Sequence, residues 1–144
     1  MRKHYRNIEA LLKLAMDVHS DHECKANHVS CITHKNEVVS FGFNARKTHP
    51  FQAKYGKNDD AIYWHSEVHA IHHALKRISE EELSKATMYV VRVKADNTMH
   101  SRLIPAMSKP CDGCMRAIRD YKLKEVIYTE DSVEELIYST VMRK

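Results

Sequence analysis

The sequence predicts an α/β fold, a three-layer α/β/α sandwich in which helices cover both faces of a mixed sheet of about five strands. Three observations support this prediction. Helical and strand-like segments follow one another in the order helix, hairpin, helix, strand, helix, strand, which is typical of a sheet between helical layers. The 144 residues suffice for one domain with a sizeable core, spanning 1–144. A composition of 43% hydrophobic and 29% charged residues is globular.

The first segments predict a helix followed by a β-hairpin. Residues 7–19 carry apolar side chains at helical spacing, and Asn7 is a suitable N-cap. Strands are expected at 28–33 and 38–43, because both segments are rich in residues that favour extended structure. A turn at 34–37 joins them.

The later elements alternate between helix and strand. They are expected, in chain order, as a helix, a strand, a helix and a strand at residues 65–78, 88–93, 111–120 and 125–129. Loops are expected at residues 51–63, as a possible lid, and at the charged connector 79–85. Residues 94–109 predict a hairpin extension near the mouth of the site, with a return strand at 102–104. The tail, residues 131–141, suits either a capped helix or a fifth strand, and we favour an antiparallel strand.

Two short motifs offer the ligands of a metal ion. His65 opens the first motif, and the second is Pro110-Cys111-Asp112-Gly113-Cys114. One imidazole and two thiolates suit Zn²⁺ with a fourth position left open. Cys111 and Cys114 are three residues apart, so on a helix they share a face. Pro110 fits the first turn of that helix, where its missing N–H leaves nothing unpaired.

Glu67 follows the metal histidine by two residues. At about 100° per residue its carboxylate points away from the ring of His65, so we expect it to handle protons and not to bind the metal. Taken alone, Cys-x-x-Cys also fits a redox pair or a structural zinc knuckle, and His-x-Glu is common on charged helices. The two motifs together, in this order, favour a catalytic zinc site.

Other histidines and cysteines are given ordinary roles. A second zinc site at His22, Cys24, His28 and Cys31 is an open alternative, although these spacings match no closed structural site. Cys24 and Cys31 are expected to be free thiols. The remaining histidines of the 65–78 helix are expected near the metal or on the surface: His69, His72 and His73.

The motif H-x-E followed by P-C-x-x-C resembles that of the zinc-dependent cytidine/deoxycytidylate deaminase superfamily, and most closely that of its dCMP deaminases, over roughly residues 28–130. The resemblance implies a cytidine deaminase-like fold, Zn²⁺ as cofactor, and His65, Cys111 and Cys114 as its ligands. It also implies that Glu67 is the catalytic group, which moves a proton from water to the ring nitrogen and protonates the departing ammonia.

The same resemblance suggests which residues bind the substrate, and each has an alternative role. Asn44 would contact the sugar, or is simply a turn-forming residue. Lys47 would meet a 5′-phosphate, or belongs to a solvated basic loop. Trp64 would stack on a pyrimidine, or fills the core. Ser66 stands where the family usually has Ala, and its hydroxyl would lie near the substrate amine.

Charge and composition narrow the range of possible functions. The net charge of +4 comes from 23 basic and 19 acidic residues that are scattered along the chain, unlike the basic stripe of a dedicated nucleic-acid binder. We therefore expect deamination of a free nucleotide, dCMP to dUMP. The alternatives are a deaminase of a free nucleoside or base, a deaminase of nucleic acid, and a non-catalytic zinc module, against which Glu67 argues.

The surroundings of the protein are expected to be aqueous. No run of about 18 apolar residues is present, so neither a transmembrane helix nor a membrane partner is expected. The basic first residues precede an amphipathic segment and not an apolar signal core, which predicts a cytoplasmic location. The resemblance further implies a homo-oligomer, in which loop 50–64 helps to complete a neighbour's pocket.

Overall fold

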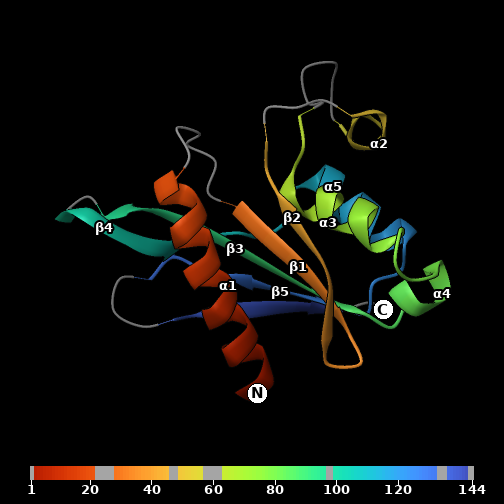
Figure 1. Ribbon diagram of the computed structural model, residues 1–144, viewed down its shortest axis with the longest axis horizontal. Helices are drawn as coiled ribbons and strands as arrows, with labels where there is room; N and C mark the ends of the chain where they lie inside the picture. Colours follow the sequence, from red (N-terminus) through yellow and green to blue (C-terminus); the bar gives the residue numbers. More distant parts are fainter. Residues whose placement is uncertain are drawn as a thin grey trace.

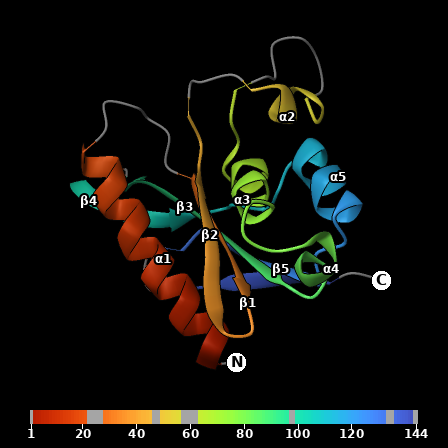
Figure 2. The ribbon, with the colours of Figure 1, turned by 45° about the vertical axis from the view of Figure 1, so that its right-hand side comes forward.

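A mixed sheet of six strands forms the centre of the computed structural model, which describes residues 2–21, 28–45, 49–56, 63–96, 99–132 and 136–142 (Figure 1). The strands are β1 (His28–His34), β2 (Glu37–Phe43), β3 (Thr87–Asp96), β4 (Met99–Ala106), β5 (Glu125–Thr129) and β6 (Tyr138–Met142). The helices are α1 (Arg2–Asp21), α2 (Pro50–Ala53), α3 (Ser66–Ala74), α4 (Glu80–Leu83) and α5 (Asp112–Asp120). Figure 2 shows α1 on one face of the sheet and α3, α4 and α5 on the other, which confirms the predicted α/β/α class.

The strand order is β2-β1-β3-β5-β6, and β4 pairs with β3 beside this path. β1 runs antiparallel to both β2 and β3, whereas β3 and β5 are parallel. A parallel pair requires a crossover, and the connection between β3 and β5 contains α5. β6 pairs antiparallel with β5, which confirms the orientation predicted for the last strand.

One edge of β3 pairs with two different strands along its length. Residues 87–90 pair with β5, and residues 92–96 pair with β4. Thr129, at the end of β5, holds this junction: its hydroxyl donates to the carbonyl of Ala106 (2.7 Å) and accepts from the N–H of Arg92 (3.3 Å). The predicted hairpin extension is therefore confirmed, but as full strands, which is why the sheet has six. The hairpin projects sideways past α1 (Figure 1).

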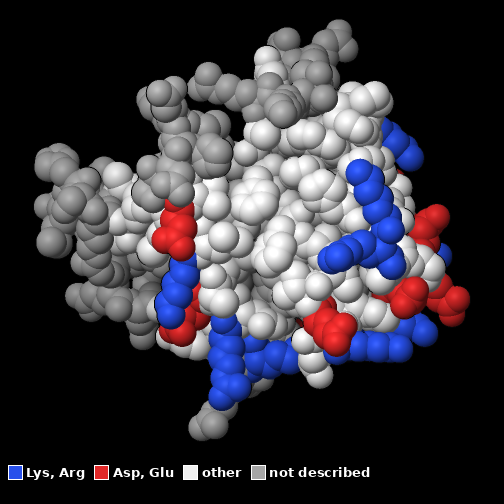
Figure 3. Space-filling view, viewed as in Figure 1, with Lys and Arg blue, Asp and Glu red and all other residues white. Residues whose placement is uncertain are grey.

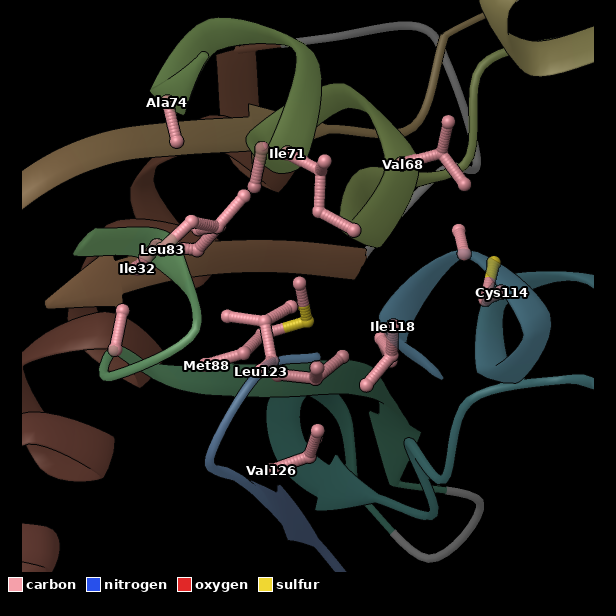
Figure 4. Close-up of a cluster of buried hydrophobic side chains, with 14 of the residues drawn as sticks. Ile32, Val68, Ile71, Ala74, Leu83, Met88, Cys114, Ile118, Leu123 and Val126 are labelled. Atoms are coloured by element: carbon pink, nitrogen blue, oxygen red, sulfur yellow. The ribbon is translucent and has the colours of Figure 1, made fainter. Parts of the chain in front are cut away.

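Two hydrophobic cores lie on opposite faces of the sheet, because alternate residues of a strand point to opposite faces. In β3, Tyr89, Val91 and Val93 pack under α1, together with Ile8 and Leu11 of that helix. The core under α3 and α5 includes Met88, Val90, Val68, Ile71, Cys114 and Ile118. Figure 4 shows this second core and places Cys114 at its end, near Val68.

The first helix begins earlier than predicted. α1 starts at Arg2, so Asn7 lies inside the helix and is not its N-cap. Arg2, Lys3 and Arg6 are good helix formers. In addition, the ring of His4 hydrogen-bonds the hydroxyl of Tyr89 (2.7 Å), which fixes the first turns against the sheet. None of the described helices is long and apolar enough to cross a membrane.

Two segments predicted as loops contain short helices. In α2, Pro50 occupies the first turn, and the ring of His49 accepts the N–H of Phe51 (3.0 Å). In α4, Ser79 and Glu82 form a capping box, which satisfies two backbone N–H groups. The predicted helix 65–78 is correspondingly shorter, because α3 ends at Ala74.

β2 and α3 approach each other closely at Gly42. A Cβ atom placed on Gly42 would lie 2.0 Å from the backbone oxygen of Ser66 and 2.4 Å from the backbone nitrogen of Ala70. Both neighbours are backbone atoms of α3, so no side chain can move aside. Gly42 therefore sets how near the first turn of α3 lies to the sheet.

We predict that Gly42→Ala destabilises the protein by about 1–3 kcal/mol or more, since an overpacked core position forces backbone shifts. Chemical denaturation measures this change in the free energy of unfolding. Val38→Ala is the matched control, because Val38 is 46% exposed on the same strand, and its cost should stay below about 1 kcal/mol. Equal costs for the two variants would contradict the close approach.

Candidate metal centre and active site

The first residues of two neighbouring helices hold the candidate metal ligands. His65 is the N-cap of α3 and Cys111 is the N-cap of α5, and neither side chain makes the usual capping hydrogen bond. Both side chains are thus available to a ligand. Cys114 follows in the first turn of α5. Pro110 precedes the helix, so its predicted place in the first helical turn is wrong by two positions, since α5 begins at Asp112.

The three ligand atoms lie within 4.8 Å of one another. Nδ1 of His65 is 3.6 Å from Sγ of Cys111 and 3.4 Å from Sγ of Cys114. A tetrahedral zinc ion with ordinary Zn–S and Zn–N bonds requires S···N separations of about 3.6 Å. Both the donor atoms and their spacing therefore fit Zn²⁺.

Without a metal, the two thiols and the imidazole compete for protons. The hydrogen bond with Cys114, followed by that with His65, lowers the pKa of Cys111 to about 3. The bond with Cys111 and burial together raise the pKa of Cys114. The bond with Cys111 also raises the pKa of His65. Cys111 is thus a thiolate at neutral pH, so metal binding must displace the proton of Cys114 and any proton that the raised pKa leaves on His65.

Glu67 is a buried carboxyl group beside these ligands. It is 5% exposed, and burial raises its pKa, while bonds from its own backbone N–H and from Ser66 oppose that rise. Glu67 also contributes to the raised pKa of Cys114, after the larger effects of Cys111 and burial. A buried carboxyl group with a raised pKa is suited to accept a proton and release it again.

Ser66 and Ser30 orient the Glu67 carboxylate. The hydroxyl of Ser66 donates to Oε1 of Glu67 (2.9 Å), and it lies 2.6 Å from the hydroxyl of Ser30 on β1. Because a hydroxyl has one hydrogen, Ser30 must be the donor to Ser66. Both serines are fully buried. Ser66 therefore faces the interior, and its contact with a substrate stays a prediction.

Gln52 of α2 holds the backbone at His65, the candidate metal histidine. Its side chain is 2% exposed, and its Oε1 accepts the N–H of His65 (2.9 Å). Sequence reasoning did not find Gln52 or Ser30, since each is a common polar residue in a segment without a motif. The sequence carries no signal for either, because their role depends on tertiary contacts.

Residues 5–130 match the family model described as the cytidine and deoxycytidylate deaminase zinc-binding region. The match spans most of the chain and includes both motifs. The chain belongs to this family. It is therefore an α/β protein of a family of hydrolytic deaminases, and its family region is a zinc-binding one, in which the structure brings His65, Cys111 and Cys114 together.

Solved structures show the same fold. The chain is similar to the dCMP deaminase of the cyanophage S-TIM5 in apo form, with a TM-score of 0.54 and 18% identity over 88% of this chain and 85% of that chain. A second structure, of the same phage enzyme in complex with dCMP and dUMP, gives a TM-score of 0.52 and 16% identity over 86% and 81% of the two chains. A search of the curated proteins finds no match.

The predicted substrate residues of the deaminase fall into different surroundings. Asn44 follows β2, and its Oδ1 accepts the N–H of His28 (3.2 Å). Lys47 lies outside the described residues. Trp64 is 8% exposed and stacks on His49, with 4.7 Å between ring centroids. The alternative role of Trp64 in the core is thus the one that the packing supports, and its contact with a substrate stays a prediction.

The other histidines of α3 pack as rings and do not converge on a metal. Nδ1 of His69 bonds to the backbone of Phe43 (3.0 Å), and Nδ1 of His73 bonds to the carbonyl of Phe41 (3.0 Å), so both tie α3 to β2. Burial lowers the pKa of His69 to about 4, which keeps this ring neutral at neutral pH. His72 lies against His49. All three rings are partly buried and pack between α3 and its neighbours, so a place near the metal stays a prediction.

The second zinc site gains no support in the part of the chain that is described. His22 and Cys24 lie outside it. His28 and Cys31 are three residues apart on β1, which places them on opposite faces of the sheet. Burial raises the pKa of Cys31 to about 12, as expected of an inert core thiol. Among the described residues, His65, Cys111 and Cys114 form the only such ligand group.

We predict that the purified protein holds one zinc ion per chain and that Cys111→Ala loses most of it. Two remaining ligands hold zinc weakly, and the fold loosens because metal binding and folding are linked. Elemental analysis gives the zinc content. Cys31→Ala is the matched control, because it removes a thiol from the opposite core and should keep full zinc. Full zinc in Cys111→Ala, or its loss from Cys31→Ala, would contradict the site.

Proposed function

We propose that this protein is a zinc-dependent deaminase that hydrolyses a cytosine nucleotide, dCMP, to dUMP with release of ammonia. The observation that carries the proposal is the buried carboxylate of Glu67 beside the ligand group of His65, Cys111 and Cys114. A structural zinc site needs no such group and usually closes with a fourth protein ligand. A proton carrier next to an open metal position is what hydrolytic deamination requires.

The chemistry divides between the metal and Glu67. Zinc supplies Lewis acidity, which makes a water molecule acidic enough to lose a proton near neutral pH. Glu67 accepts that proton and delivers it to the ring nitrogen next to the amine-bearing carbon, which spares the attacked ring an unstabilised negative charge. Glu67 then moves a second proton from the added oxygen to the amine. Ammonia leaves, a carbonyl remains, and the carboxylate is restored.

The residues around the site support the choice of a nucleotide as the substrate. Asn44 uses Oδ1 for the N–H of His28; among the described residues its amide N–H₂ group makes no hydrogen bond, so it can donate to a sugar hydroxyl. Figure 3 shows Lys and Arg near Asp and Glu at the rim of the visible face, with an uncharged centre. Among the residues drawn in colour, this face carries no basic groove of the kind that polynucleotide binders use. Together with the scattered charges of the sequence, this supports a small substrate. A homo-oligomer and a cytoplasmic location are also proposed, from the family resemblance and from the sequence.

Ammonia release from a panel of substrates tests the proposed function. The panel contains dCMP, deoxycytidine, cytidine, adenosine and a single-stranded oligodeoxynucleotide, each with the zinc-loaded protein. The proposal expects the highest kcat/KM on dCMP. A higher kcat/KM on another member would make that compound the preferred substrate in place of dCMP. No ammonia release from any member would overturn the proposal that the protein is a deaminase.

We predict that Glu67→Gln lowers kcat by about 10⁴-fold or more and keeps the zinc. General acid–base catalysis contributes about 10²–10⁴-fold, and in this site one group serves both proton transfers. Gln has the same size but cannot carry a proton. Ammonia release and zinc content are measured on the same samples.

Glu81→Gln serves as the control for Glu67→Gln, since Glu81 is exposed on α4 and distant in sequence from both motifs. It should leave both kcat and zinc content unchanged. Near wild-type turnover in Glu67→Gln, or loss of its zinc, would remove Glu67 from its proposed role.

A further inference from the structure

Arg92 is a charged residue in the middle of the central strand. It follows Met88 and Val90 at the strand period of two, and both of these lie in the core under α3 and α5. Arg92 therefore projects from the face of the sheet that carries the metal ligands. Its cross-strand partners are His28 on β1 and Ala106 on β4, at the base of the hairpin that the deaminase adds to its sheet.

The guanidinium of Arg92 is incompletely paired within the protein. Its Nε is buried and makes no hydrogen bond. No carboxylate among the described residues lies within ion-pair distance of it, although Asp131 is near enough for Arg92 to help lower the pKa of that carboxyl group. Asp131 itself accepts the N–H of Met107 (2.9 Å) and pairs with Lys94 (3.3 Å). A buried, unpaired donor of this kind is costly and indicates a ligand.

His28 connects Arg92 with the metal centre. The two residues face each other across β1 and β3, and the N–H of His28 bonds to Asn44, the proposed sugar contact. Burial, then the charge of Arg92, then that of His65 lower the pKa of His28 to about 4. The charges of Arg92 and His65 therefore both act on His28. Its ring stays neutral at neutral pH, so it adds no charge that competes with Arg92. These contacts place Arg92 on the sugar side of the proposed pocket.

We propose that Arg92 binds the 5′-phosphate of a free cytosine nucleotide and thereby sets the preference of the enzyme for nucleotide over nucleoside. A planar guanidinium matches a phosphate with two parallel hydrogen bonds, which a lysine cannot reproduce. Because this proposal names the substrate group, it rests on the proposed function. It also assigns a role to an arginine that follows the apolar run of residues 88–91 in β3.

The test compares substrates with and without the phosphate. The ratio of kcat/KM for dCMP to that for deoxycytidine is measured for wild type, Arg92→Met and Arg92→Lys. We expect Arg92→Met to lower this ratio by about 10- to 100-fold, mainly through KM for dCMP, as for a lost hydrogen bond between charged groups. Arg92→Lys keeps the charge but loses the two parallel hydrogen bonds of the guanidinium. Its ratio should therefore lie between those of wild type and Arg92→Met.

Lys94→Met is the matched control. Lys94 lies two residues further along β3, on the same face, and pairs with Asp131. Its removal should leave the ratio within about threefold of wild type, since an exposed ion pair contributes little. Circular dichroism and the thermal midpoint of each variant report whether it is folded.

Three results would overturn the role of Arg92. The first is an unchanged ratio in Arg92→Met. The second is an equal fall on both substrates, which indicates a structural role. The third is a fall confined to a single-stranded oligodeoxynucleotide, because the phosphate would then belong to a polynucleotide.

Binding measurements distinguish a failure of the proposed function from a failure of the role proposed for Arg92. If the wild type deaminates neither dCMP nor deoxycytidine, titration calorimetry with dUMP and deoxyuridine still tests Arg92. A phosphate-dependent affinity that is lost in Arg92→Met supports the phosphate site without the reaction. Equal affinity of wild type and Arg92→Met for dUMP overturns it.

Discussion

The candidate metal site depends on the contact between two helix N-termini, because the candidate ligands are divided between them. His65 caps α3 and Cys111 caps α5, so a shift of either helix by about 1 Å would spoil the tetrahedral spacing. Glycine permits the close packing at two points. Gly42 lets β2 touch the backbone of α3, and a Cβ on Gly113 would lie 2.1 Å from the carbonyl oxygen of Tyr55.

A second constraint is the burial of Glu67. A carboxylate at 5% exposure is costly unless its oxygens are bonded, and the Ser30–Ser66 pair supplies a donor from the sheet. This support fixes one oxygen of Glu67 and so positions the carboxylate beside Cys114. In this way the central sheet supports Glu67 directly, through Ser30 of β1, while α2 supports the backbone of His65 through Gln52.

Sequence reasoning recovered what depends on spacing and missed what depends on contacts. The motif spacing and the family resemblance predicted the candidate zinc ligands and Glu67, and the structure brings the three candidate ligands together. The start of α1 was missed because the bond between His4 and Tyr89 joins distant segments. Arg92 was passed over in a strand predicted as a near-continuous apolar run, because the burial of its Nε depends on tertiary packing.

X-ray absorption at the zinc edge tests the central claim most directly, since it reports the atoms around the metal in the intact protein. The structure predicts two sulfur ligands at about 2.3 Å and two nitrogen or oxygen ligands at about 2.0–2.1 Å, one of them from solvent. A shell of four protein ligands would make the zinc structural. A shell without sulfur would show that Cys111 and Cys114 do not bind it, and either result would contradict a catalytic zinc held by these two helices.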